Sequence, residues 1–144
     1  MLFVGLLQVL ENRVIRFSRG NTSREYLYNL IDNYLENNDR NVFLYPEGTR
    51  CKHSILSTIE DVKKTIKPGL LKSIYENKKY PIQIFISTNK EKCFNEKTFE
   101  ISFGQTIKTS IGKEIHPTNF NSFDEFFDAI CIDWLLLWNK VYLN

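Results

Sequence analysis

The sequence NVFLYPEGTR, residues 41–50, joins an apolar run to a turn that carries a carboxylate and a guanidinium. Its first part, residues 41–46, predicts a buried strand that ends at Pro46, because proline cannot donate to a strand ladder. Gly48 allows the backbone to turn sharply and to approach a ligand closely. Arg50 offers a planar group that matches phosphate oxygens. The stretch therefore predicts a phosphate-binding turn, with a simply solvated arginine as the alternative.

An earlier strand and a helix precede this turn. Residues 13–18, RVIRFS, predict a short strand. Thr22 and Glu25 have the spacing of a capping box, which predicts a helix that extends to about Glu36. The order strand, helix, strand is typical of parallel pairing in an α/β domain. We therefore expect a mixed, largely parallel central sheet flanked by helices, with ligands binding at the carboxyl ends of its strands.

Two short helices are expected after the turn. Ser57 and Glu60 form a second capping box, which predicts a helix to about Ile66. Pro68 and Gly69 interrupt this helix, and the apolar spacing beyond them predicts another.

Two strands and a long helix are expected in the second half of the chain. The apolar run 81–88 and the alternating run 98–104 predict the strands. Ser122 and Glu125 form a third capping box at the start of the helix. Apolar residues on one face of this helix are Phe123, Phe126, Phe127, Ile130, Trp134, Leu137, Trp138 and Val141.

Length and composition limit the class of protein. A chain of 144 residues predicts one domain, residues 1–144. The net charge of +2, without a dense basic stripe, argues against a nucleic-acid partner. The dispersed Cys51, Cys93 and Cys131 predict reduced thiols in a cytosol-facing compartment. Cys51 and His53 are not accompanied by a further Cys/His cluster, so no metal or other cofactor is predicted.

The first ten residues, MLFVGLLQVL, are apolar. They are fewer than the roughly 20 residues that cross a bilayer. They also lack the basic start and the cleavage site of a signal peptide. They predict a core helix or strand, with a membrane-surface helix or the start of a truncated longer domain as alternatives.

The PEGTR sequence, preceded by apolar residues, resembles the third signature block of the glycerolipid acyltransferases. This family includes the 1-acylglycerol-3-phosphate O-acyltransferases and other lysophospholipid acyltransferases. In the family, the block lies at the active site and its arginine helps to hold the glycerol phosphate. The resemblance implies substrate-binding roles for Glu47, Gly48, Thr49 and Arg50.

Further residues resemble other parts of the family pattern. Arg19 lies 27 residues before Pro46 and ends an apolar run, as does the arginine of the family's second block. The resemblance implies that Arg19 and Arg50 hold one phosphate from two sides, and a solvated strand end is the alternative for Arg19. Lys67 and Gly69 resemble a Lys/Gly pair that follows the third block, which makes them further substrate-binding candidates.

The family's first block, HxxxxD, which supplies the catalytic base, is missing. The only histidines are His53 and His116, and the residues five positions after them are Thr58 and Asn121. No catalytic residue is therefore predicted. The missing block is expected upstream of the first residue, so the chain resembles the C-terminal two-thirds of an acyltransferase domain.

The resemblance implies a reaction and a place in the cell. A fatty acyl group would move from acyl-CoA to a lysophospholipid such as lysophosphatidate, in phospholipid biosynthesis or remodelling. The protein would associate with the cytosolic face of a membrane, with an endomembrane expected. The alternatives are a non-catalytic lipid- or phosphate-binding remnant of that family, and an unrelated α/β phosphate-binding domain.

Overall fold

The computed structural model describes residues 22–38, 41–46, 58–88, 90–95 and 98–143. The chain divides into two compact units, Met1–Leu44 and Tyr45–Asn144. The expectation of a single domain stays a prediction.

The described part of the first unit contains the helix α2, Arg24–Asn37. Its N-cap is Ser23, whose hydroxyl accepts a hydrogen bond from the backbone N–H of Tyr26 at 3.1 Å. The predicted helix is confirmed, but the predicted capping box of Thr22 and Glu25 is wrong by one residue. Serine and threonine both cap helices well, so two adjacent candidates left the first residue ambiguous in the sequence.

Residues 41–46 do not form the predicted buried strand. The side chains of Phe43 and Tyr45 are 76% and 77% exposed. A strand requires a neighbouring strand for its backbone hydrogen bonds, and an apolar run alone does not provide one. The predicted strand at 13–18 lies outside the described residues.

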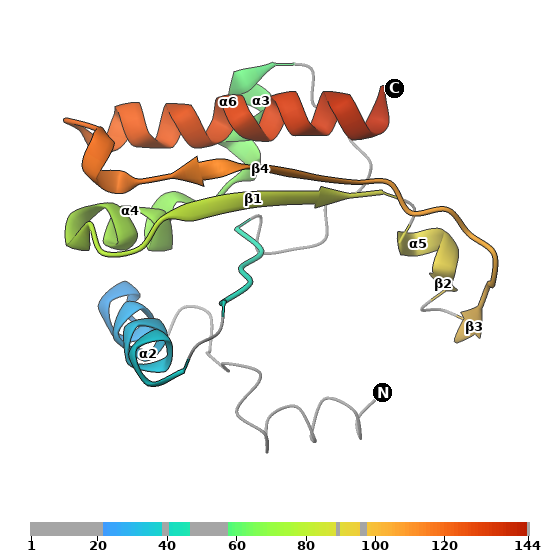
Figure 1. The fold of residues 1–144 in the computed structure, drawn as a ribbon, viewed down its shortest axis with the longest axis horizontal. Helices are drawn as coiled ribbons and strands as arrows, with labels where there is room; N and C mark the ends of the chain where they lie inside the picture. Colours follow the sequence, from blue (N-terminus) through green and yellow to red (C-terminus); the bar gives the residue numbers. More distant parts are fainter. Residues whose placement is uncertain (1–21, 39–40, 47–57, 89, 96–97, 144) are drawn as a thin grey trace. The chain divides into compact units, whose positions relative to one another are not determined.

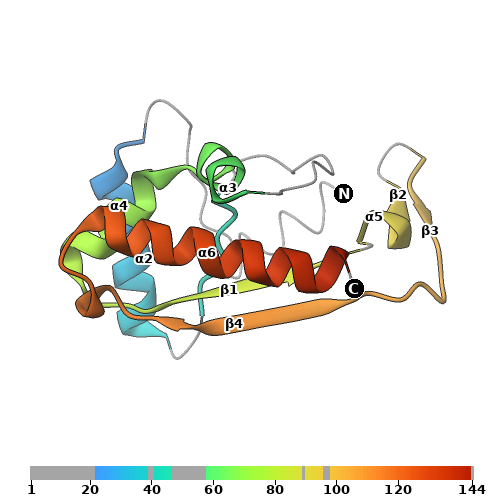
Figure 2. The same ribbon diagram turned by 90° about the horizontal axis from the view of Figure 1, so that it is seen from above.

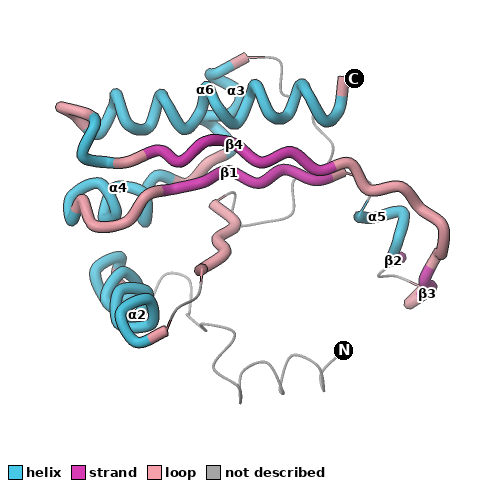
Figure 3. Tube along the Cα trace, viewed as in Figure 1, coloured by secondary structure: helices cyan, strands magenta, loops and turns pink. Residues whose placement is uncertain are grey.

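The second unit is built on the strands β1, Ile82–Ser87, and β4, Thr109–Ile115. The two strands are antiparallel, with Ile82 opposite Ile115 and Ser87 opposite Thr109. Their opposite directions can be followed from the arrows in Figure 1, and Figure 3 shows the two strands side by side. β1 confirms the strand predicted at 81–88, whereas β4 was not predicted.

The expected parallel sheet is not supported by the described strands. The second pair, β2 (Phe94–Asn95) with β3 (Glu100–Ile101), is also antiparallel. The strand predicted at 98–104 is therefore reduced to the two residues of β3. These described residues form a mixed α/β fold in which the described pairs are antiparallel.

Helices flank the long strand pair. The helix α3, Ile59–Thr65, has Thr58 as its N-cap and Asp61 as the reciprocal partner in a capping box. This differs by one residue from the predicted box of Ser57 and Glu60. The helix α4, Pro68–Asn77, follows after Lys67, and the short helix α5, Lys90–Cys93, precedes β2.

The C-terminal helix α6, Phe123–Tyr142, confirms the prediction made from the third capping box. The Ser122 hydroxyl accepts from the N–H of Glu125 at 3.2 Å. α6 runs along one face of the β1–β4 pair, as the two perpendicular views in Figures 1 and 2 show. Between β4 and α6 lies the 3₁₀ turn η1, Pro117–Asn119.

The core of this unit lies between α6, the strand pair and the helices α3 and α4. Phe126 and Val62 are fully buried in it, and the rings of Tyr75 and Phe126 lie 5.6 Å apart. The remaining buried apolar core residues are Ile66, Leu71, Ile84, Ile86, Ile115, Ile130, Cys131, Trp134, Leu137, Trp138 and Val141. In the described part of the chain, no helix has both the length and the apolar character that a bilayer crossing requires.

Candidate functional site

The predicted phosphate-binding turn is not described by the structure. Arg19, Glu47, Gly48, Thr49 and Arg50 all lie outside the described residues. Their proximity to one another and to a ligand therefore stays a prediction.

Lys67 and Gly69 are the predicted site residues that the structure describes. Lys67 is the exposed N-cap of α4, and Gly69 lies in the exposed first turn of that helix. The backbone N–H of Lys67 donates to the carbonyl of Pro46 at 2.8 Å. This hydrogen bond places the first residue of the PEGTR sequence beside the start of α4. A Cβ on Gly69 would meet no atom within 4 Å, so packing does not require a glycine there.

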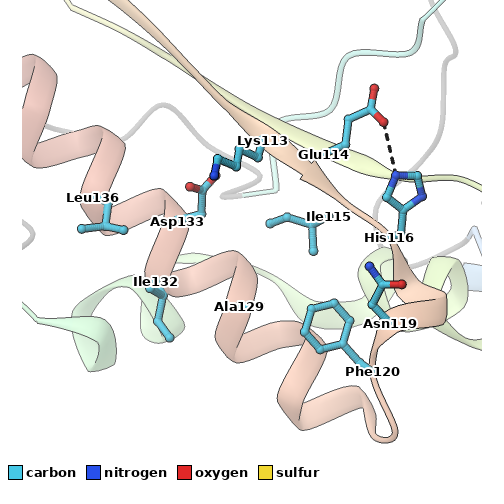
Figure 4. Close-up of a pocket in the computed structure, with 10 residues that line it drawn as sticks. All are labelled: Lys113, Glu114, Ile115, His116, Asn119, Phe120, Ala129, Ile132, Asp133 and Leu136. Atoms are coloured by element: carbon cyan, nitrogen blue, oxygen red, sulfur yellow. Dashed lines mark ion pairs between the residues drawn. The ribbon is translucent and has the colours of Figure 1, made fainter.

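A groove lies between β4 and α6, the β4–α6 groove (Figure 4). Its volume is about 320 Å³. Its apolar lining comes from the end of β4, from the segment before α6 and from one side of α6. These apolar residues are Ile115, Phe120, Ala129, Ile132 and Leu136.

The polar lining of this groove contains four ionisable side chains. Lys113, Glu114 and His116 come from β4 and its end, and Asp133 comes from α6. The Nε2 atom of His116 lies 3.3 Å from Glu114 Oε2. Asn119 adds an amide. Sequence reasoning assigned none of these residues to a site.

The pairing of β1 with β4 is irregular beside the groove, on the side that β4 forms. Gln83 is opposite Glu114 and Phe85 is opposite Ile111, so two residues of β4 face one residue of β1 between these pairs. This is the pattern of a β-bulge, which bends a strand and redirects its side chains. The bulge falls at Gly112, whose carbonyl accepts a hydrogen bond from the Gln83 side chain at 3.0 Å.

Asp133 packs against the bulge. A Cβ on Gly112 would overlap Asp133 Oδ2 and would lie 3.0 Å from Leu137 Cδ1. Asp133 Oδ2 is buried and has no hydrogen-bond partner in the described structure. Burial raises the pKa of this carboxyl, and the charge of Lys113 opposes that effect. The carboxylate is therefore close to a backbone that leaves no room for a side chain, and it retains unused hydrogen-bonding capacity.

The described cysteines show no sign of a reactive or metal-binding site. Burial raises the pKa of the Cys131 thiol to about 11, although Lys63 opposes the shift, so the thiol is neutral at physiological pH. Cys93 and Cys131 are both free thiols in the described structure, and the redox state expected from the sequence stays a prediction. Among the described residues, no group of three or more His, Cys, Asp or Glu side chains could hold a metal ion.

Comparison of the chain with protein-family models, with curated proteins and with solved structures gives no match. An assignment of function therefore depends on the sequence motif and on the geometry described above.

Proposed function

We propose that the chain is part of a glycerolipid acyltransferase and binds the phosphate of a lysophospholipid such as lysophosphatidate. The observation that carries this proposal is the PEGTR sequence at residues 46–50, which follows an apolar run. Arg50 is the main phosphate contact, because a guanidinium pairs with two phosphate oxygens at once. Arg19, at the family spacing before Pro46, is a second contact. Glu47, Gly48 and Thr49 shape the turn.

The contact between Pro46 and Lys67 supports this proposal. The hydrogen bond between their backbone atoms brings the start of the motif to the N-terminus of α4. Lys67 is one of the residues that resemble the family pattern, and its exposed side chain is available to a charged substrate. A lysine there adds positive charge for a phosphate without the fixed geometry of an arginine.

In the proposed reaction, the free hydroxyl of the lysophospholipid attacks the thioester carbon of acyl-CoA. The carbon–sulfur bond breaks, the new ester forms, and CoA leaves as its thiol. The hydroxyl proton must pass to a general base, which contributes about 10²–10⁴-fold to such reactions. The 144 residues contain no HxxxxD sequence to supply this base. We therefore propose acyl-CoA and a lysophospholipid at a cytosol-facing membrane surface as partners, and binding without turnover for this chain by itself.

The missing HxxxxD sequence favours one alternative function, a non-catalytic lipid- or phosphate-binding remnant of the same family. The genomic reading frame upstream separates the two proposals, because an in-frame HxxxxD sequence supports the enzyme.

The biochemical test combines binding with turnover. The purified chain is mixed with vesicles that contain lysophosphatidate, and then with acyl-CoA while thioester consumption is followed. We expect binding to these vesicles and no thioester consumption. Failure to bind would contradict both family-based proposals, and clear turnover would contradict the remnant and direct attention to His53 as a substitute base.

A further inference from the structure

The apolar side of the β4–α6 groove is exposed to water. Ile132 and Leu136 lie one turn apart on α6, and their side chains are 45% and 62% exposed. Asp133 lines the same groove, and its carboxylate points from α6 toward β4 (Figure 4). Apolar surface beside a defined polar group is typical of small-molecule sites. The ligand that fits such a wall has an apolar body and one polar end.

The charges of the groove determine the sign of that polar end. The lining holds two carboxylates, Glu114 and Asp133, and one lysine, Lys113. Glu114 already has His116 as a partner. Asp133 Oδ2 is buried against Gly112, and among the described residues neither a hydrogen bond nor an ion pair engages the other carboxylate oxygen, so that oxygen is the one a ligand could reach. Asp133 is therefore the group best able to accept a charged donor.

The position of Asp133 is set by rigid elements. It projects from the middle of the 20-residue helix α6 toward the bulge in β4, where Gly112 leaves space for it. Sites built on helices and strands hold their groups more precisely than sites on loops. The bulge in β4 and the absence of a side chain at Gly112 together create the space that the Asp133 carboxylate occupies.

We propose that the β4–α6 groove binds a small organic cation with an apolar body, of the alkylammonium class. Asp133 accepts hydrogen bonds from the ammonium group, and Ile132 and Leu136 contact the alkyl part. Lys113 limits the affinity, because it repels the ligand's charge. This site is separate from the proposed phosphate-binding residues and does not depend on the proposed acyltransferase function.

The first test compares three probes of equal length on the full chain near neutral pH: hexylammonium, hexanol and hexanoate. Binding is measured by NMR chemical-shift titration of the backbone amides of β4 and α6. We expect saturable shifts with hexylammonium and at least about tenfold weaker binding of hexanol, since a charge-assisted hydrogen bond is lost. Equal binding of hexanol, or tighter binding of hexanoate, would overturn the proposal.

Two substitutions with opposite expected effects sharpen the test. Asp133→Asn should weaken hexylammonium binding about tenfold or more, whereas Lys113→Gln should strengthen it because a repulsive charge is removed. Asp124→Asn, in the exposed first turn of α6, is the matched control and should leave binding unchanged. Unchanged binding by Asp133→Asn would refute the site. If Asp133→Asn does not fold, the Lys113→Gln variant provides the test instead, because Lys113 is exposed. Weaker or unchanged hexylammonium binding by Lys113→Gln would refute the proposed site.

Discussion

Gly112 and Gly69 occupy opposite environments although both are glycines in the second unit. A methyl group on Gly112 would overlap the Asp133 carboxylate and approach Leu137, whereas one on Gly69 would enter open space. Gly112→Ala should therefore destabilise the fold by about 1–3 kcal/mol, near the lower end because the Asp133 side chain can rotate away. Gly69→Ala should stabilise α4 by about 0.5–1 kcal/mol, since alanine favours a helix.

Urea unfolding of both variants and the parent measures these differences. A Gly112→Ala variant as stable as the parent would show that the bulge does not hold Asp133 as described.

Asp133 links stability to pH. Burial raises the pKa of its carboxyl above 3.8, so the folded chain binds this proton more tightly than the unfolded chain does. The group therefore favours folding below the unfolded-state pKa, and this contribution is lost as the pH rises through the folded-state pKa. Asp133→Asn removes the charged form, so we expect a small rise in Tm at neutral pH that shrinks as the pH approaches 3.8.

Thermal unfolding of parent and variant, followed by circular dichroism over a pH series, measures this effect. A variant that is less stable than the parent at neutral pH would contradict the buried, unpartnered description of Asp133.

At the scale of elements, the helices could be predicted because their signals are local. The face predicted for α6 includes Phe126, Trp134 and Val141, and all three are buried. The capping box of α3 and the N-cap of α2 were each misplaced by a single residue, because neighbouring serines and threonines can serve equally well.

The strands were predicted less well because they depend on distant partners. The run 81–88 is apolar almost throughout and forms β1 as expected. The sequence of β4, TSIGKEI, does not alternate apolar and polar residues, because Gly112, Lys113 and Glu114 separate its two isoleucines, and the bulge falls at Gly112 and Lys113. The apolar run 41–46 has no strand beside it in the described structure, so the pattern that predicted a buried strand was misleading.

α6 is the element on which the core of the second unit depends most. Phe126 is 0% exposed and packs against Tyr75 and Phe120, with ring centroids 5.6 Å away in both cases. Phe126→Ala should cost about 3–5 kcal/mol, because it removes a buried ring and leaves a cavity. Leu136→Ala on the exposed side of the same helix is the control and should change stability by no more than about 0.5 kcal/mol.

Equilibrium unfolding in denaturant gives both values. Similar losses from the two substitutions would mean that α6 does not pack in the orientation described.

At the scale of the whole molecule, one of the two candidate sites could be predicted from the sequence and the other could not. The PEGTR sequence is a contiguous motif, so it could be compared with known patterns without a fold, but its residues 47–50 lie outside the described structure. The β4–α6 groove could not be predicted, because it joins residues 113–116 to residues 129–136 and depends on a bulge. The signal available in the sequence was the exposed pair Ile132 and Leu136, which lies off the predicted buried face of α6.

The central claim is that Arg50 binds the phosphate of a lysophospholipid, and vesicle binding of three chains tests it most directly. The parent, Arg50→Ala and Arg50→Lys are compared on vesicles with and without lysophosphatidate, with circular dichroism to confirm that each chain is folded. We predict that Arg50→Ala loses about 1.5–3 kcal/mol of binding free energy and that lysine restores only part of it, since an ammonium lacks the planar fork. A folded Arg50→Ala chain that binds lysophosphatidate as tightly as the parent would contradict the claim.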